Sequence, residues 1–144
     1  MIQEDTIKLL RECNAGIKMG VGSIDEVLPK VKSSQLRNSL EKSRSAHTKL
    51  GDETHSLLAQ YGDRGKEPSP VAKGMSWMKT NVQLALEDSD KTVANLITDG
   101  CNMGVKSLNR YLNQYKAAEE QAKRIADRLI TLEDSLAQEM QPYL

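Results

Sequence analysis

The sequence contains no phenylalanine, and only 3% of its 144 residues are aromatic. Aromatic and β-branched residues favour strands, so this composition disfavours a sheet and favours helices. No stretch approaches the roughly 18 apolar residues that a membrane-spanning helix needs. At this length we expect one domain, residues 1–144.

The chain has no excess charge of either sign, with 20 basic and 20 acidic residues. Nucleic-acid and anionic-membrane binders usually carry excess positive charge, so neither partner is expected. The first ten residues, MIQEDTIKLL, carry acids where a secretory signal has basic residues. Two cysteines are too few for a disulfide framework. A cytoplasmic protein is therefore expected.

Four long segments carry apolar residues at alternating spacings of three and four, which is typical of helices with one buried face. The first begins after Asp5 as its N-cap and ends near Pro29, and the second follows Ser33 and has His47 in the middle of its apolar face. The third follows the N-cap sequence Asp88-Ser89-Asp90. The segments cover about residues 6–31, 34–61, 89–115 and 117–141. The fourth predicts a buried stripe of Ala118, Ala122, Ile125, Leu129, Leu132, Leu136 and Met140.

Residues 62–88 separate the second and third helices. Two glycines and two prolines between positions 62 and 70 exclude a helix there, and a short helix with Trp77 is expected over about residues 71–86. This connection is much longer than a helical hairpin needs, and it is long enough to cross the length of the bundle.

An internal repeat appears when the chain is shifted by 84 positions. The shift places GIKMGVGS, residues 16–23, on GCNMGVKS, residues 100–107, and Arg44 on Arg128. The repeat predicts two duplicated helical hairpins, residues 5–61 and 89–141, joined by the crossover 62–88.

Such a pair of hairpins resembles the ferritin-like four-helix bundle. More closely, the chain is similar to small bacterial ferritin-like domains of unknown function in LLRECNAG at residues 9–16, SRSAH at 43–47, the Trp77 helix and TDGC at 98–101. The resemblance implies an all-α fold of four long helices and a short crossover helix. In metal-binding members, the first and third helices each supply a glutamate, and the second and fourth each supply Glu-x-x-His.

The ligand set of those members is degenerate in this chain. The motif of the second helix falls on Arg44-Ser45-Ala46-His47, and that of the fourth falls on Arg128-Leu129-Ile130-Thr131. The glutamate positions fall near Ile17 and Cys101. We therefore predict no cofactor. A non-standard iron, manganese or zinc site remains the alternative, with His47, Asp99 and Cys101 as its candidate ligands.

Four glycines lie within the predicted helices at positions equivalent in the repeat: Gly16, Gly20, Gly100 and Gly104. A glycine inside a helix costs about 1 kcal/mol relative to alanine. We expect these glycines to let the first and third helices cross more closely than the usual roughly 8–10 Å, which would leave little room for metal ions. A small ligand-binding concavity over bare backbone is the alternative.

Several polar or reactive residues lie on or beside the predicted apolar faces. His47 is expected to be a buried neutral histidine that is hydrogen-bonded to Ser43 or a tyrosine. Cys13 and Cys101 are expected to be buried, and a redox pair would need their Cα atoms within about 7 Å. Arg44 and Arg128 are expected at the surface, with internal pairing to Glu12 or Asp99 as the alternative.

These observations predict a non-catalytic bundle that acts by protein–protein contact, as a homodimer or with another protein. The biological process and the identity of any partner stay open at this point.

Overall fold

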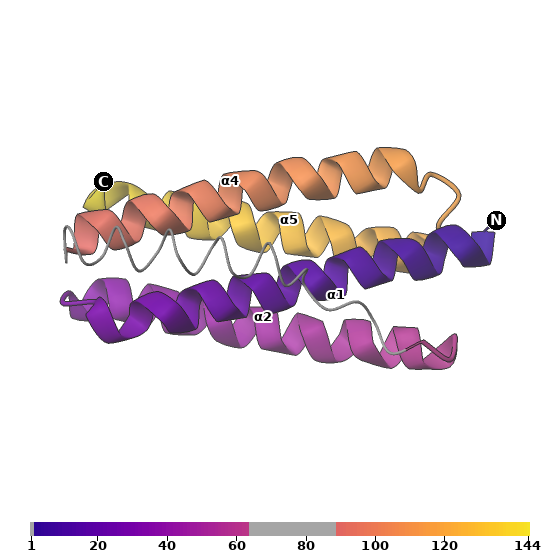
Figure 1. Cartoon of the computed structure of the whole chain (residues 1–144), viewed down its shortest axis with the longest axis horizontal. Coiled ribbons are helices and arrows are strands. Elements are labelled where there is room, and N and C mark those ends of the chain that lie inside the picture. Colours follow the sequence, from indigo (N-terminus) through magenta and orange to yellow (C-terminus); the bar gives the residue numbers. More distant parts are fainter. Residues whose placement is uncertain (1, 64–88) are drawn as a thin grey trace.

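A computed structural model describes residues 2–63 and 89–144 of the chain (Figure 1). The described residues form four long helices and no strand, which confirms the all-helical prediction. The predicted crossover helix with Trp77 lies outside the described residues. The long helices are α1 (Ile2–Val27), α2 (Ser34–Gln60), α4 (Asp90–Gln114) and α5 (Glu120–Met140), and the 3₁₀ turns are η1 (Leu28–Lys30) and η2 (Gln141–Tyr143).

The four helices lie side by side as two antiparallel pairs, α1 with α2 and α4 with α5 (Figure 1). Helix α2 ends at one end of the bundle and α4 begins at the other, so these two helices run in the same direction and α1 runs antiparallel to α4. Both α1 and α5 pack against all three other long helices. None of the described helices contains a stretch long and apolar enough to cross a membrane.

The helix boundaries follow local capping signals. The Ser33 side chain accepts a hydrogen bond from the backbone N–H of Leu36, and Ser89 does the same for Thr92, so two serines cap α2 and α4. Pro29 lies in η1, directly after α1, as the proline rule predicts. These boundaries confirm the predicted starts of the second and third helices.

Two aspartates join the hairpins at opposite ends of the bundle. The Asp90 carboxylate accepts hydrogen bonds from the backbone N–H groups of Lys32 (2.8 Å) and Ser33 (2.9 Å). At the other end, the Asp5 carboxylate accepts one from the N–H of Ala117 (3.1 Å). The prediction that Asp5 is an N-cap was wrong, because α1 already begins at Ile2 and Asp5 lies in its first turn.

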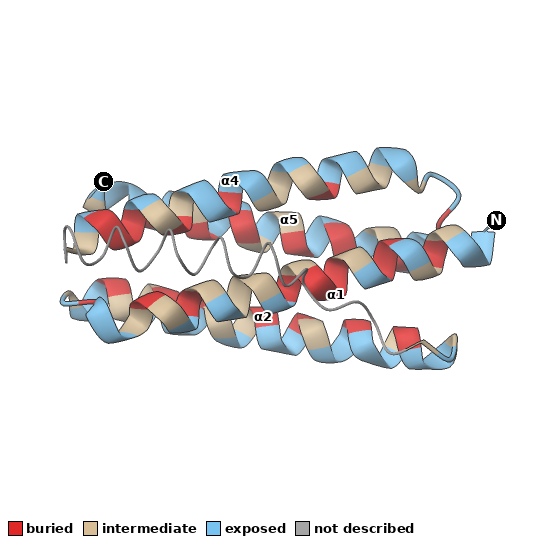
Figure 2. Ribbon diagram, viewed as in Figure 1, coloured by how far each residue is buried: buried red, intermediate tan, exposed pale blue. Residues whose placement is uncertain are grey.

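All four long helices carry buried residues along their length (Figure 2). The buried apolar side chains form two separate clusters. The first lies toward the start of α1, and the second lies toward its end. Members of the first cluster include Leu10, Ile17, Leu50, Leu108 and Leu129. Members of the second include Ile24, Leu40, Ile97, Cys101 and Leu136. On every helix, a short interval separates the residues of one cluster from those of the other.

Candidate functional site

A polar layer occupies the interval between the two apolar clusters. Each long helix contributes one residue to it: Gly20 from α1, His47 from α2, Gly104 from α4 and Glu133 from α5. Cys101 of the second apolar cluster, about one turn before Gly104, borders this layer and interacts with the same Glu133. We refer to these five residues as the central cluster.

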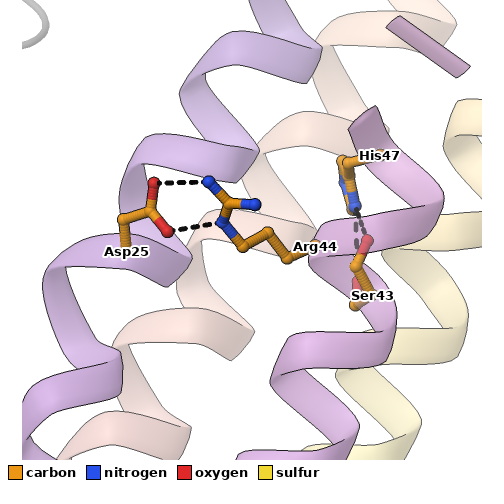
Figure 3. Close-up of polar contacts among 4 residues, drawn as sticks. All are labelled: Asp25, Ser43, Arg44 and His47. Carbon is orange, nitrogen blue, oxygen red and sulfur yellow. Dashed lines mark hydrogen bonds and ion pairs between the residues drawn. The ribbon is translucent and has the colours of Figure 1, made fainter. Parts of the chain in front are cut away.

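The imidazole of His47 is fully buried and has a hydrogen-bond partner at each nitrogen. Its Nε2 lies 2.9 Å from Oε1 of Glu133. Its Nδ1 lies 2.8 Å from the carbonyl oxygen of Ser43, and Figure 3 shows this second contact. The Ser43 hydroxyl lies 3.3 Å from the same nitrogen, so a protonated Nδ1 donates to the carbonyl oxygen and a bare Nδ1 accepts from the hydroxyl. The predicted burial of His47 and its bond to Ser43 are confirmed.

The surroundings of His47 raise its pKa above the ordinary 6.5. Burial is the largest single influence and lowers the pKa, because it disfavours the charged ring. The hydrogen bond and charge of Glu133, together with the Ser43 carbonyl, act the other way and outweigh burial. The sequence had predicted a neutral ring, whereas these contacts extend the pH range over which the ring is protonated.

Gly20 and Gly104 provide the space that the buried pair occupies. A Cβ placed at Gly20 would lie 3.0 Å from Cδ2 and 3.1 Å from Nε2 of His47. A Cβ at Gly104 would lie 3.4 Å from Oε2 of Glu133. The nearest atoms are therefore side chains of α2 and α5, not the facing backbone of α1 or α4 that the sequence led us to expect. Side-chain atoms of His47 and Glu133 therefore occupy space next to these glycines.

The other two predicted glycines have no such role. A Cβ at Gly16 would make an ordinary contact with Leu129, 3.6 Å away, and a Cβ at Gly100 would meet no atom of the described residues within 4 Å. Two surface grooves of the described part lie instead between α2 and α5, where Arg128 lines both. The described surroundings of Gly16 and Gly100 therefore do not support the close helix crossing that was expected at these glycines.

Both cysteines are buried, as predicted, and neither forms a disulfide. Burial, followed by the charge of Glu133 and a hydrogen bond to it, raises the pKa of the Cys101 thiol. Burial raises the pKa of Cys13 to about 12. The two residues lie on opposite sides of the Gly20–Gly104 level, separated by about ten residues of helix or roughly 15 Å along the bundle. That separation excludes a disulfide between them.

The three candidate metal ligands do not form one group. His47 and Cys101 are buried and both interact with Glu133, whereas Asp99 is exposed on α4. Within residues 2–63 and 89–144, no three His, Cys, Asp or Glu side chains form a group that could hold a metal ion.

The two repeat-related arginines lie at the surface, as predicted. Arg44 pairs with Asp25 of α1 (Figure 3), and Arg128 pairs with Glu53 of α2. All four side chains are between 42% and 51% exposed, so neither contact is an internal ion pair. The partners also differ, because the first pair lies within one hairpin and the second joins the two hairpins.

Glu133 is the central residue that the sequence reasoning missed. It is 8% exposed and follows Leu129 by four positions and precedes Leu136 by three, so it lies on the buried face of α5. The prediction placed Leu132 on that face, but Leu132 is only half-buried. The spacing of three and four residues continues through Glu133 and indicates that this residue is buried. The adjacent Leu132 was expected on that face instead, because leucine is apolar and glutamate is charged.

No family model, curated protein or solved structure matches the chain. Under the 84-residue shift, buried His47 corresponds to exposed Thr131, so the two halves differ at the central layer. The ferritin-like resemblance and the duplication therefore stay predictions.

Proposed function

We propose that this chain is a non-catalytic, ferritin-like helical bundle that acts through contacts with proteins, either a second copy or another partner. The observation that carries the proposal is the buried His47–Glu133 pair at the centre of the bundle. In metal-binding relatives of such a bundle, the corresponding region would supply the ligands.

The central side chains are already engaged with one another. Nδ1 of His47 is hydrogen-bonded to Ser43, Nε2 is hydrogen-bonded to Glu133, and the Cys101 thiol interacts with that same carboxylate. A cation would bind only after displacing these hydrogen bonds and the protons they hold. Because these polar groups already have partners inside the bundle, their arrangement supports a structural function of the centre. Contacts with other molecules are then made by the outer surface.

The outer surface favours a protein partner over a polyanion. Acidic and basic residues are equal in number, and the described arginine pairs at the surface are bonded to acids. Mixed charge of this kind suits complementary protein contacts, whereas nucleic acid attracts a surface with excess positive charge.

Metal analysis tests this proposal against the metal-binding alternative. The full chain is produced in medium supplemented with iron, manganese and zinc, purified without chelator, and compared with His47→Ala by elemental analysis. We expect far less than one metal per chain in both proteins. Stoichiometric metal that is lost in His47→Ala would overturn the proposal and favour a non-standard metal site.

Light scattering coupled to size-exclusion chromatography tests self-association over a wide range of protein concentrations. We expect a dimer that dissociates on dilution. A monomer at every concentration would rule out the homodimer and restrict the proposal to a different partner protein.

A further inference from the structure

Two surface grooves of the described part lie one after the other between α2 and α5, and Arg128 lines both. We refer to the residues that line the two grooves as the α2–α5 face. Leu132 lies in the first groove and Leu57 in the second, and both leucines are only partly buried. Covering their remaining apolar surface would be favourable, because it removes that surface from water.

An ion pair crosses the α2–α5 face between its two helices. Nη2 of Arg128 on α5 lies 2.6 Å from Oε2 of Glu53 on α2, and both side chains are about half exposed. Since they are in contact, the two residues lie at the same level of the bundle. An exposed pair of this kind contributes little to stability within the chain, so each of the two charges can also contact a second molecule.

A second copy of the chain has charges that match this face. When two copies face each other across a twofold axis parallel to the helices, α2 of one copy lies opposite α5 of the other. Glu53 of each copy then lies opposite Arg128 of the other, so the four charges alternate in sign. A twofold axis perpendicular to the helices at this level would place Arg128 opposite Arg128, which is unfavourable.

The ion pair between Arg44 and Asp25 provides an internal comparison. It joins α2 to α1, and its two side chains are as exposed as those of Arg128 and Glu53. Neither Arg44 nor Asp25 lines one of the two grooves, however. The α2–α5 face therefore combines a bridging ion pair with partly exposed leucines, whereas the Arg44–Asp25 pair lies outside this combination.

We propose that the α2–α5 face is a homodimer interface, where two copies cover Leu57 and Leu132 and place Glu53 of each copy against Arg128 of the other. The face extends over residues 46–57 of α2 and 121–132 of α5, about three helical turns. For a contact this short we expect a weak dimer that forms at high protein concentration. This inference rests on the proposed function, because it names the surface and the partner of the same contact.

Sedimentation equilibrium of two complementary charge variants of the full chain, Arg128→Glu and Glu53→Arg, tests the interface. Each variant alone places like charges opposite each other at both symmetry-related contacts, so we expect its dimer to be at least roughly tenfold weaker than that of the wild type. In an equimolar mixture, every glutamate faces an arginine of the other chain, and we expect heterodimers of nearly wild-type affinity. Mixing leaves the like charges within each chain unchanged, so this recovery reports contacts between chains.

Arg44→Glu is the matched control, because it reverses an equally exposed arginine of another ion pair and should dimerise like the wild type. Circular dichroism checks the helical content of every variant. If a charge variant does not fold, Ser56→Arg replaces it. This change adds a bulky side chain at an exposed position of the second groove and should likewise weaken the dimer at least roughly tenfold.

The possible failures of this inference and of the proposed function can be distinguished. A wild-type dimer that the folded variants of the α2–α5 face leave intact, or that Arg44→Glu weakens equally, would overturn the interface, while self-association would stand. Weakened single variants that do not recover on mixing would also overturn it. A wild type that is monomeric at every concentration would overturn this inference and restrict the proposed function to a different partner protein.

Discussion

His47 of α2 and Glu133 of α5 are 86 positions apart in the chain and meet through a 2.9 Å hydrogen bond inside the bundle. Each lies on the buried face of its helix, where apolar side chains continue on both sides. The contact joins the first hairpin to the second. Because a buried polar group is satisfied only in one alignment, the pair favours a single register of α2 against α5.

Removing one member of this pair should cost far more stability than removing both. His47→Leu or Glu133→Leu leaves an unpaired buried polar group, and such losses are about 3–5 kcal/mol in the free energy of unfolding. The double variant replaces the layer by apolar side chains and should lie close to wild type. Urea unfolding of the four proteins gives the coupling energy. Additive effects would contradict the buried pair.

Removal of an exposed ion pair provides the comparison. Arg128→Gln breaks the contact with Glu53, where both side chains are about half exposed, so we expect a loss of less than about 1 kcal/mol. If Arg128→Gln lost as much unfolding free energy as His47→Leu or Glu133→Leu, burial would not determine how much each contact contributes to stability.

Stability should depend on pH through His47. Its pKa is raised in the folded protein, so its contribution is present below the unfolded value of about 6.5 and is lost as pH rises through the folded pKa. We expect the free energy of unfolding to fall between about pH 6 and about pH 8, a range below the ordinary ionisation of unfolded cysteines. In urea unfolding, the free energy of unfolding of His47→Gln should depend less on pH than that of the wild type. An equal pH dependence in both proteins would show that another group causes it.

Alanine substitutions should separate the glycines by their surroundings. Gly20→Ala should be destabilising, because its Cβ would lie 3.0 Å from His47, whose ring is held by two hydrogen bonds and cannot easily move. Gly100→Ala should be stabilising by about 0.5–1 kcal/mol, because a Cβ there meets no atom in residues 2–63 or 89–144 and alanine favours the helix. Thermal melts check both, and equal effects of the two variants would contradict this account.

The Asp90 carboxylate should contribute measurably to the junction between the hairpins. Asp90→Ala removes two hydrogen bonds from backbone N–H groups of the α1–α2 connection, for which we expect a loss of about 1–3 kcal/mol. Asp52→Ala, at an exposed position of α2, is the control and should lie within about 0.5 kcal/mol of wild type. If both variants unfold at the same urea concentration, the junction does not depend on Asp90.

The helices could be predicted because their signals are local. The serine caps at Ser33 and Ser89, the proline after α1 and the three–four spacing of apolar residues all act within a few positions of the chain. Asp5 shows the limit of these signals. Its carboxylate accepts a hydrogen bond from the backbone N–H of Ala117, 112 positions away, instead of capping its own helix.

The central cluster could be predicted only in part, because its contacts join different helices. The burial of His47 followed from its place on an apolar face, but Glu133 as its partner depends on how α2 and α5 align. The missing Cβ of Gly20 and Gly104 does allow a close approach, as predicted. The approaching groups are the side chains of His47 and Glu133, and not the helix backbone that was expected.

The protonation of the His47 ring tests the central claim most directly, and long-range ¹H–¹⁵N correlation spectra report it. In uniformly labelled full-length protein at about pH 6, below the raised pKa, we predict that both ring nitrogens carry protons that exchange slowly with water. A ring with one bare nitrogen in rapid contact with solvent, or with a nitrogen shifted by a bound metal, would contradict a bundle closed by this pair.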